Sequence, residues 1–220
     1  MIDLHTHTLF SDGALLPTEL ARRAKAAGYQ AMAFTDHVDA SNLFLVLENV
    51  GRVAAQGATY LGLDILLGVE LTHVPPGLIA RLADSARMNG AELVVVHGET
   101  IVEPVELGTN LAAIEAGVDI LAHPGLITPE EAQLAAERGV HLEITTRKGH
   151  SLTNGHVAAM ARRFGAKLVI NNDAHAPGDL ISRDQRRRVA LGAGLTQDEY
   201  LQAEANSWAL VDRGRRKGEG

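Results

Sequence analysis

The chain has 220 residues, of which 46% are hydrophobic and none is cysteine, and its formal net charge is −7. This length and apolar content suffice for one domain with a sizeable core, and single α/β barrels commonly have about this size. The absence of cysteine excludes a disulfide framework and thiolate metal ligands, so any metal site must use nitrogen and oxygen. The acidic balance argues against a general nucleic-acid-binding protein.

The sequence offers no sign of a membrane or export segment. No apolar run approaches the roughly 18 residues that a membrane span requires. Met1 stands directly before the first predicted strand, which leaves no room for a signal peptide. We therefore expect a cytoplasmic protein without a membrane partner, and the sequence makes no prediction of its oligomeric state.

One unit recurs along the chain: a helix that ends at a glycine, a short loop, an apolar run and a polar residue. The glycines that end the helices are Gly28, Gly90, Gly117, Gly139 and Gly165. Glycine readily takes the left-handed conformation just past a helix end, and uninterrupted apolar runs are typical of parallel strands covered on both faces. This pattern predicts strands near residues 2–5, 31–35, 64–69, 92–96, 119–122, 140–144 and 167–171.

Alternation of strands and helices indicates βαβ units with right-handed crossovers. Helix starts support it, because Thr128 to Glu131 and Thr196 to Glu199 each form a capping-box sequence. Every predicted strand has a candidate ligand or a carboxylate at its C-terminal end. Only a closed barrel brings those ends to one mouth, so we predict one barrel domain over residues 1–205. The basic cluster of Arg213 to Lys217 predicts a solvated, flexible tail over residues 206–220.

Nine histidine and carboxylate side chains at these strand ends are the candidate metal ligands. They are His5, His7, Asp12, His37, Glu70, His97, His123, Asp173 and His175. Imidazole nitrogen and carboxylate oxygen are ligands that zinc, manganese and iron accept, and nine could hold two or three divalent ions. His5 and His7 share the two-residue period of a strand, so both side chains point to one side, and the pair Asp173 and His175 repeats that spacing.

Three carboxylates near these histidines need separate arguments. Asp12 lies in a Ser-Asp-Gly turn, and its nearness to the first histidine pair favours ligation over a simple turn role. Asp36 and His37 are neighbours on a strand, so only one faces the site. We choose His37 and leave Asp36 either as an acceptor that fixes a histidine tautomer or as a solvated loop residue. Glu70 follows a buried run, where a carboxylate is costly unless it is paired or coordinated, and it could bridge two ions.

The loop after the sixth predicted strand carries Arg147, Lys148 and His150 and should overhang the same mouth. Arg147 offers a planar fork suited to phosphate oxygens, although a solvated basic loop is an equally simple interpretation. The role of His150 stays open, as does that of Glu143, which could support a ligand or contact substrate.

The remaining histidines have no place in the predicted site. We expect His73 and His156 on the surface or in loops, and His141 near the start of a strand, at the opposite end of the barrel. Glu99 stays undecided.

These residues also carry a resemblance. The motifs that contain them are Asp3-Leu4-His5-Thr6-His7, Ser11-Asp12-Gly13, Thr35-Asp36-His37, Gly68-Val69-Glu70, His97, Ala122-His123-Pro124 and Asp173-Ala174-His175. In this order and along nearly the whole chain, they resemble the polymerase and histidinol phosphatase (PHP) family.

The resemblance implies a distorted seven-stranded (β/α) TIM-like barrel, a two- or three-metal site and phosphoester hydrolysis. It implies that Glu70 bridges two ions and that the other ligands divide among three. The first ion would take His5, His7 and Asp173, the second His97 and His123, and the third Asp12, His37 and His175.

The predicted function is therefore a metal-dependent phosphoesterase. Three carboxylates against three divalent ions leave the site positive, which suits a phosphate group. We expect metal-bound hydroxide to attack the phosphorus of a small phosphate monoester, as in a histidinol phosphatase, or of a small phosphodiester or nucleotide. If nucleic acid binds, we expect it only as a substrate. Arg147 would bind the phosphate, and Asp12, His175 or a water would protonate the leaving group.

Two alternatives compete with this interpretation. An amidohydrolase barrel also begins with His-x-His, but it usually has a bridging lysine on the fourth strand, where this chain has His97. A non-catalytic PHP module with a regulatory or nucleic-acid-associated role is the other alternative. Such a copy should have lost ligands, and none of the nine is missing here.

Overall fold

The structure, a computed structural model, describes the backbone of residues 1–218 and is built from eight parallel strands and eight α-helices in that range. The strands are β1 (Ile2–Asp3), β2 (Ala31–Phe34), β3 (His37–Val38), β4 (Asp64–Leu71), β5 (Leu93–His97), β6 (Ile120–Ala122), β7 (His141–Thr145) and β8 (Leu168–Asn171). The helices are α1 (Pro17–Ala26), α2 (Leu43–Ala54), α3 (Pro76–Met88), α4 (Thr109–Glu115), α5 (Pro129–Arg138), α6 (Asn154–Phe164), α7 (Arg183–Gly192) and α8 (Gln197–Gly218). Three short helical segments are η1 (Gly57–Leu61), η2 (His150–Thr153) and η3 (Pro177–Asp179).

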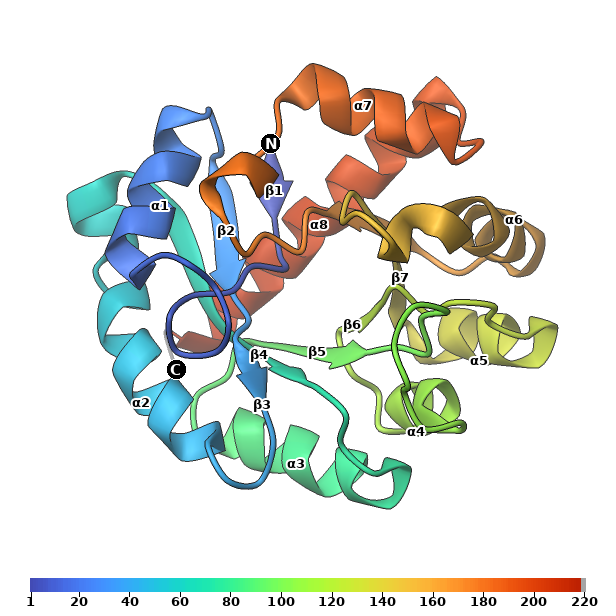
Figure 1. Ribbon diagram of the computed structural model, residues 1–220, viewed down its shortest axis with the longest axis horizontal. Helices are drawn as coiled ribbons and strands as arrows, with labels where there is room; N and C mark the ends of the chain where they lie inside the picture. The colour runs from blue at the N-terminus through green and yellow to red at the C-terminus, as the bar shows by residue number, and fades with distance from the viewer. Residues whose placement is uncertain (219–220) are drawn as a thin grey trace.

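The strands follow the order β1-β2-β4-β5-β6-β7-β8, and β3 pairs with the last part of β4. β3 lies two residues after β2 and pairs with the same neighbour, so the two together occupy one of seven positions. The helices surround the strands (Figure 1). The prediction of a distorted seven-stranded, TIM-like barrel in a single domain is confirmed.

The barrel is nearly closed at the seam between β1 and β8. A single parallel bridge joins Thr6 to Ala174, with bonds from His7 N to Ala174 O at 2.8 Å and from Ala174 N to His5 O at 3.2 Å. Between the end of β1 and the end of β8, a side chain takes the place of a backbone hydrogen bond: Leu4 N donates to Asn171 Oδ1 at 3.0 Å. This seam sets the two His- and Asp-bearing segments side by side.

Alternation along the strands separates two apolar cores. Side chains that point into the barrel form the inner one: Ile2, Leu4, Ala31, Ala33, Leu66, Leu93, Val95, Ile120, Ala122 and Val169. Their neighbours on the strands, such as Met32, Phe34 and Val94, belong to the outer core beneath the helices. Strands apolar on both faces are what a helix-covered parallel sheet requires, which is why uninterrupted apolar runs predicted them.

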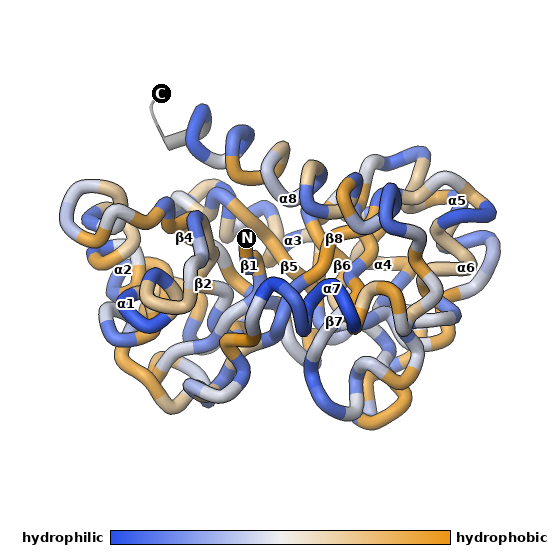
Figure 2. Tube along the Cα trace, turned by 90° about the horizontal axis from the view of Figure 1, so that it is seen from above, coloured by the Kyte–Doolittle hydropathy of each residue, from blue (hydrophilic) through white to orange (hydrophobic). Residues whose placement is uncertain are grey.

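Helix α8 closes the N-terminal end of the barrel. Its Leu210 and Val211 are buried in the inner core, and the helix crosses behind the strands in Figure 1 and along the edge away from most loops in Figure 2. Arg213 contacts Asp119 before β6, and Arg215 contacts Asp64 at the start of β4.

The structure places residues 206–218, which the sequence predicted to be a flexible tail, in helix α8. Residues 219 and 220 lie outside the described part of the chain. Arg213 and Arg215 are paired with carboxylates near strand starts, and the preceding Leu210 and Val211 are buried in the inner core.

Candidate metal centre

All nine predicted ligands lie at the mouth of the barrel, opposite α8. At the seam they lie in two pairs, His5 with His7 and Asp173 with His175. Elsewhere they lie singly, as where His97 ends β5 and His123 follows β6. Glu70 lies within β4, which extends to Leu71, two residues further than predicted. The structure thus brings together side chains separated by as many as 170 positions.

The innermost group consists of buried imidazoles and carboxylates that face one another. His5 Nε2 lies 3.1 Å from Glu70 Oε1 and 3.7 Å from Asp173 Oδ1. His7 Nε2 lies 3.1 Å from Asp173 Oδ1, and His123 Nε2 lies 3.8–3.9 Å from Asp173 and Glu70. Two sets of three ligand atoms, each within 4.8 Å of one another, could hold an ion here: His5, His7 and Glu70, and His5, His123 and Asp173.

The polar atoms of this group fit a divalent ion. Several that are fully buried have no hydrogen-bond partner: His5 Nε2, both ring nitrogens of His7 and His123, Glu70 Oε1 and Asp173 Oδ1. Buried polar atoms without partners are rare because they cost free energy. Ligands about 2.0–2.1 Å from a tetrahedral ion lie about 3.3 Å from one another, close to the 3.1–3.9 Å spacing found here.

A second group lies nearer the solvent and consists of His7, Asp12, His37 and His175. Asp12 Oδ1 is 3.3 Å from His37 Nε2 and 3.1 Å from His175 Nε2. The His7 ring stacks on that of His175, with centroids 4.1 Å apart, and lies tilted against that of His37 at 4.2 Å. Asp12, a turn residue in the sequence, is thus placed among ligands, and His7 borders this group as well as the inner one.

A third group contains a histidine whose role the sequence left open. His97, His123 and His150 are all buried, and one ring nitrogen from each could hold an ion. Glu103 faces two of them, with Oε2 3.2 Å from His97 Nε2 and Oε1 3.3 Å from His150 Nε2. Sequence reasoning missed Glu103, because it lies in an irregular loop with no periodicity and no adjoining strand.

Protonation states suit metal binding at four residues of the inner group. At the fifth, His5, burial alone would lower the pKa, but Glu143, Glu70 and Asp173 raise it well above its ordinary value, so His5 must lose a proton to bind an ion. Burial lowers the pKa of His7 to about 3 and that of His123 well below its ordinary value, so both imidazoles are neutral at neutral pH. Burial alone would raise the pKa of Glu70 and Asp173, but the facing histidines hold both well below the usual range. Neutral imidazole and ionised carboxylate are the forms that coordinate metals.

Polar groups beside the candidate ligands hold them in place. Glu143 Oε2 lies 2.8 Å from His5 Nδ1, so the other nitrogen of His5 faces the centre. His37 Nδ1 lies 2.6 Å from Glu70 Oε2 and 2.7 Å from Oγ1 of the half-buried Thr72. Bonds of this kind fix the tautomer and orientation of a ligating imidazole.

Asp36 contacts no histidine in this arrangement. It accepts bonds from Thr8 N at 2.7 Å and from Ser11 Oγ at 2.7 Å, and so it fixes the loop that carries Asp12. Both interpretations left open for Asp36, a histidine partner and a solvated loop residue, are wrong.

Backbone strain marks the same site. Among the described residues other than glycine, three have positive φ: His73 at 50°, His123 at 28° and Asp173 at 53°. Such conformations cost about 1–3 kcal/mol each and concentrate at functional sites. His73, expected in a loop, is there, and its ring stacks on His97 at 5.4 Å.

The other two histidines separate by position. His141 begins β7, at the closed end as expected, with Nδ1 3.2 Å from Asp119 O. His156 lies on α6 and not in a loop, and its half-buried side chain has Nε2 2.8 Å from Ile127 O.

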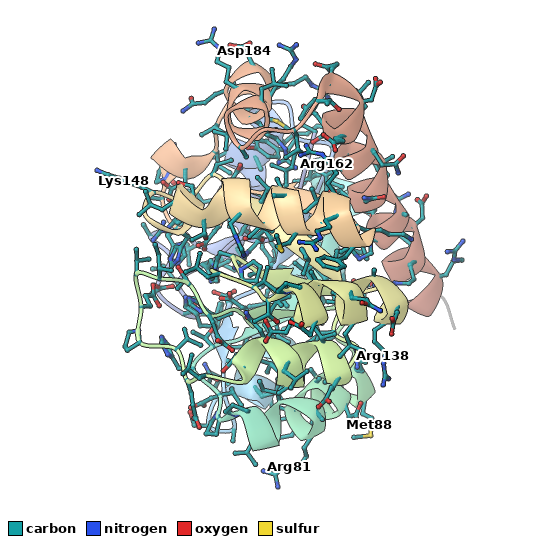
Figure 3. All side chains as sticks on the ribbon, turned by 90° about the vertical axis from the view of Figure 1, so that its right-hand side faces the viewer. Arg81, Met88, Arg138, Lys148, Arg162 and Asp184 are labelled. Carbon is teal, nitrogen blue, oxygen red and sulfur yellow. The ribbon has the colours of Figure 1, made fainter. Side chains whose placement is uncertain are left out.

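Above these groups opens a polar cavity of about 260 Å³. Its lining includes Asp12, His37, His175 and Arg147. Arg147 Nη1 lies 3.3 Å from Asp179 Oδ2, and Nε lies 3.9 Å from Asp173 Oδ2, so the guanidinium borders the ligands. Lys148 does not join it but projects from the mouth side into solvent (Figure 3).

Comparison with known proteins identifies the family. A family model described as the PHP domain matches residues 3–147, which is more than half of the chain. The chain belongs to the PHP domain family. Asp173 and His175 lie beyond the matched range, but the seam of this PHP domain places them beside His5 and His7.

Three relatives span nearly the whole chain. An uncharacterized protein of Methanocaldococcus jannaschii is 51% identical over 90% of this chain and 91% of its own. A probable phosphatase of Thermoanaerobacter sp. strain X514 is 28% identical over 93% and 91% of the two chains. The ribonuclease P protein component 3 of Methanosarcina mazei is 28% identical over 95% and 87%.

A solved structure supports the barrel architecture. A chain in an archaeal ribonuclease P with mature tRNA superposes with a TM-score of 0.72 at 18% identity, covering 98% of this chain and 92% of that one. At this identity the likeness concerns the fold alone. Among the described residues, no helix has both the length and the apolar content to cross a membrane.

Proposed function

We propose that this PHP domain is a metal-dependent phosphoesterase acting on a small phosphorylated substrate. The observation that carries the proposal is the set of buried, unpartnered ring nitrogens and carboxylate oxygens that converge at one mouth. The nine residues of the family motifs are all present, and the probable phosphatase among the relatives agrees with this activity.

We assign the ligands in three groups around Glu70. His5, His7 and Asp173 would hold one ion, His97 and His123 a second, and Asp12, His37 and His175 a third. Zinc, manganese and iron all accept this nitrogen and oxygen set. When bound, the ions would supply Lewis acidity to a phosphoryl group and to a water nucleophile.

The chain's own residues would position the phosphate and handle the leaving-group proton. The guanidinium of Arg147 faces the ligand set and could bind two phosphate oxygens in a planar fork. Asp12 and His175 lie at the open edge of the cavity, 3.1 Å apart, and whichever of the two does not ligate the third ion could protonate the leaving oxygen. The 260 Å³ cavity suits a small monoester, diester or nucleotide better than an extended strand.

A second candidate follows from the ribonuclease P component among the relatives: a non-catalytic PHP module in a nucleic-acid assembly. The net charge of −7 opposes direct binding to a phosphate backbone. A purely structural subunit also has no need for buried histidines and carboxylates without partners, each of which costs stability.

Hydrolysis assays separate the candidates. Protein loaded with Mn²⁺, Zn²⁺ or Fe²⁺ should hydrolyse p-nitrophenyl phosphate or its bis-ester, and EDTA should abolish this turnover. The better of the two substrates would distinguish a monoesterase from a diesterase. His7→Ala and Asp173→Ala should lose activity while the barrel still folds. Near-wild-type turnover in a folded, metal-loaded variant would contradict the ligand assignment. Absence of both turnover and bound metal would favour the non-catalytic module.

A further inference from the structure

The group of His97, His123 and His150, which surrounds the second of the three proposed ions, contains one imidazole more than the family motifs supply. His150 lies with His97 and His123 so that one ring nitrogen from each falls within 4.8 Å of the others. We propose that His150 is a direct ligand of the ion held by His97 and His123, and that Glu103 supplies the carboxylate that completes this group. The inference rests on the metal centre of the proposed function.

The backbone is built to bury this loop histidine. Gly149 has φ 94° and ψ −60°, a conformation that side-chain-bearing residues rarely adopt, and the chain turns inward there. Asn154 fastens the base of the loop, because its Oδ1 accepts from Thr145 N at 3.1 Å and its Nδ2 donates to Thr145 O at 2.7 Å. His150 is only 7% exposed as a result, although it follows no strand directly.

His97 and His150 present the same nitrogen to the same carboxylate. His97 Nδ1 donates to Gly98 O at 3.1 Å, and its Nε2 lies 3.2 Å from Glu103 Oε2. His150 Nδ1 is engaged with Thr100 Oγ1 at 2.8 Å, and its Nε2 faces Glu103 at 3.3 Å. In a ligating histidine one nitrogen bonds to the protein and the other faces the ion, so Nε2 of each ring is the nitrogen free to coordinate, with Glu103 at the spacing of a further ligand.

A metal-free alternative satisfies His150 but not its neighbour. Thr100 could donate to Nδ1 of His150 while the proton on Nε2 bonds to Glu103. His123, whose ring stacks on that of His150 at 4.2 Å, would still have two buried nitrogens without partners. An ion in this group gives His123 a partner, so coordination accounts for more of the buried polar atoms.

Glu103 is the adaptable member of the group. Its side chain is 38% exposed and lies in the loop between β5 and α4. The start of that loop is fixed because Glu99 Oε1 accepts from Gly108 N and Asn110 N, each at 2.9 Å. Because the Glu103 side chain is partly exposed and the loop start is fixed without it, replacing Glu103 tests the site without disturbing the barrel.

The test measures metal binding rather than turnover. His150→Gln and Glu103→Gln would be compared with wild type by metal content after dialysis, by Zn²⁺ competition against a chromophoric chelator, and by the visible spectrum of the Co²⁺ form. His156→Gln is the control, because it removes an imidazole on the same side of the barrel but keeps a donor for Ile127 O.

We expect His150→Gln to weaken one Zn²⁺ site by about 100-fold or more, since losing even a group that only orients a ligand costs about 10- to 100-fold. Glu103→Gln should weaken Zn²⁺ binding at the same site about tenfold. Both variants should change the visible spectrum of the Co²⁺ form, whereas His156→Gln should match wild type in affinity and spectrum. Unchanged affinities and Co²⁺ spectra in both variants would overturn the inference and leave the proposed function standing. A wild-type protein that binds no metal would overturn both.

Discussion

Glu143 illustrates how a buried residue can serve the centre without lying in it. Its Oε2 lies 2.8 Å from His5 Nδ1 and accepts from Asn171 Nδ2 at 2.9 Å. The sequence left open whether Glu143 supports a ligand or contacts substrate. Since the side chain is fully buried beneath His5, the geometry favours the supporting role.

Glu143→Gln should weaken metal binding while the fold is retained. The amide keeps the shape of the side chain but removes the negative charge that makes His5 a stronger ligand, so we expect a loss of about 10- to 100-fold in affinity. Competition with a chromophoric chelator measures it. Glu137→Gln, an exposed glutamate on α5, is the matched control, and equal affinities in the two variants would contradict the supporting role.

His141 makes stability depend on pH at the closed end of the barrel. Burial lowers its pKa to about 4, assisted by the charges of Lys167 and Arg213. The unfolded chain, with a histidine pKa of about 6.5, binds more protons between these values. Stability is therefore complete above pH ~6.5 and falls, by about 3 kcal/mol from this group, as the pH drops toward ~4.

His141→Asn should reduce this acid-induced loss. The asparagine amide can replace Nδ1 as a donor to Asp119 O but does not titrate. Urea unfolding at pH 7.5, 6 and 4.5 should show a shallower decline for the variant than for wild type. Parallel curves would mean that other buried histidines account for the whole effect.

Candidate metal ligands could be predicted where they lie at the end of an apolar strand. His97 ends a run of four buried apolar residues, and the sequence alone therefore indicated its place at the mouth. His150 and Glu103 lie in loops whose paths depend on Gly149 and on side-chain bonds to the backbone. No periodicity encodes such a path, so the third group could not be assembled from sequence.

At the level of elements, the predicted strands agree with the structure to within about two residues, because buried parallel strands are long apolar runs. β3 was missed, since a two-residue strand has no pattern. The second half of α8 was missed for a different reason. Its arginines have the composition of a solvated tail, and only tertiary contacts with Asp64 and Asp119 make them part of the barrel.

Leu210→Ala tests whether α8 is a structural part of the barrel. The side chain is 2% exposed and belongs to the inner core, so its truncation should cost about 2–5 kcal/mol of unfolding free energy. Leu201→Ala is the control on the same helix, because Leu201 is 55% exposed and should cost little. Urea denaturation measures both, and equal costs would contradict the role of α8 as a plug.

At the level of the whole molecule, the two ends of the barrel have opposite characters. The end under α8 is filled with apolar side chains and ion pairs, whereas the mouth holds strained backbone and buried polar atoms without partners. Cavity size does not locate the site. Cavities of about 410 Å³ beside α6 and α8 and 660 Å³ beside α1 and α2 both exceed the 260 Å³ mouth. The chemistry of the lining decides it.

Metal removal should therefore destabilise the entire barrel and not only inactivate it. Ions that bind the folded state shift unfolding by about 2.7 kcal/mol per site at a hundred times the dissociation constant. Urea unfolding of EDTA-treated protein should have a lower midpoint than that of protein in Zn²⁺ or Mn²⁺, with an unchanged slope.

The dependence on metal should shrink when ligands are removed. Asp173→Ala takes a carboxylate from the inner group, so its unfolding midpoint should rise less on metal addition than that of wild type. Exposed Asp184→Ala, far from the mouth on α7, should respond as wild type does. If metal raised the midpoint of all three proteins equally, the ions would be binding elsewhere, and the buried nitrogens and oxygens at the mouth would need another partner.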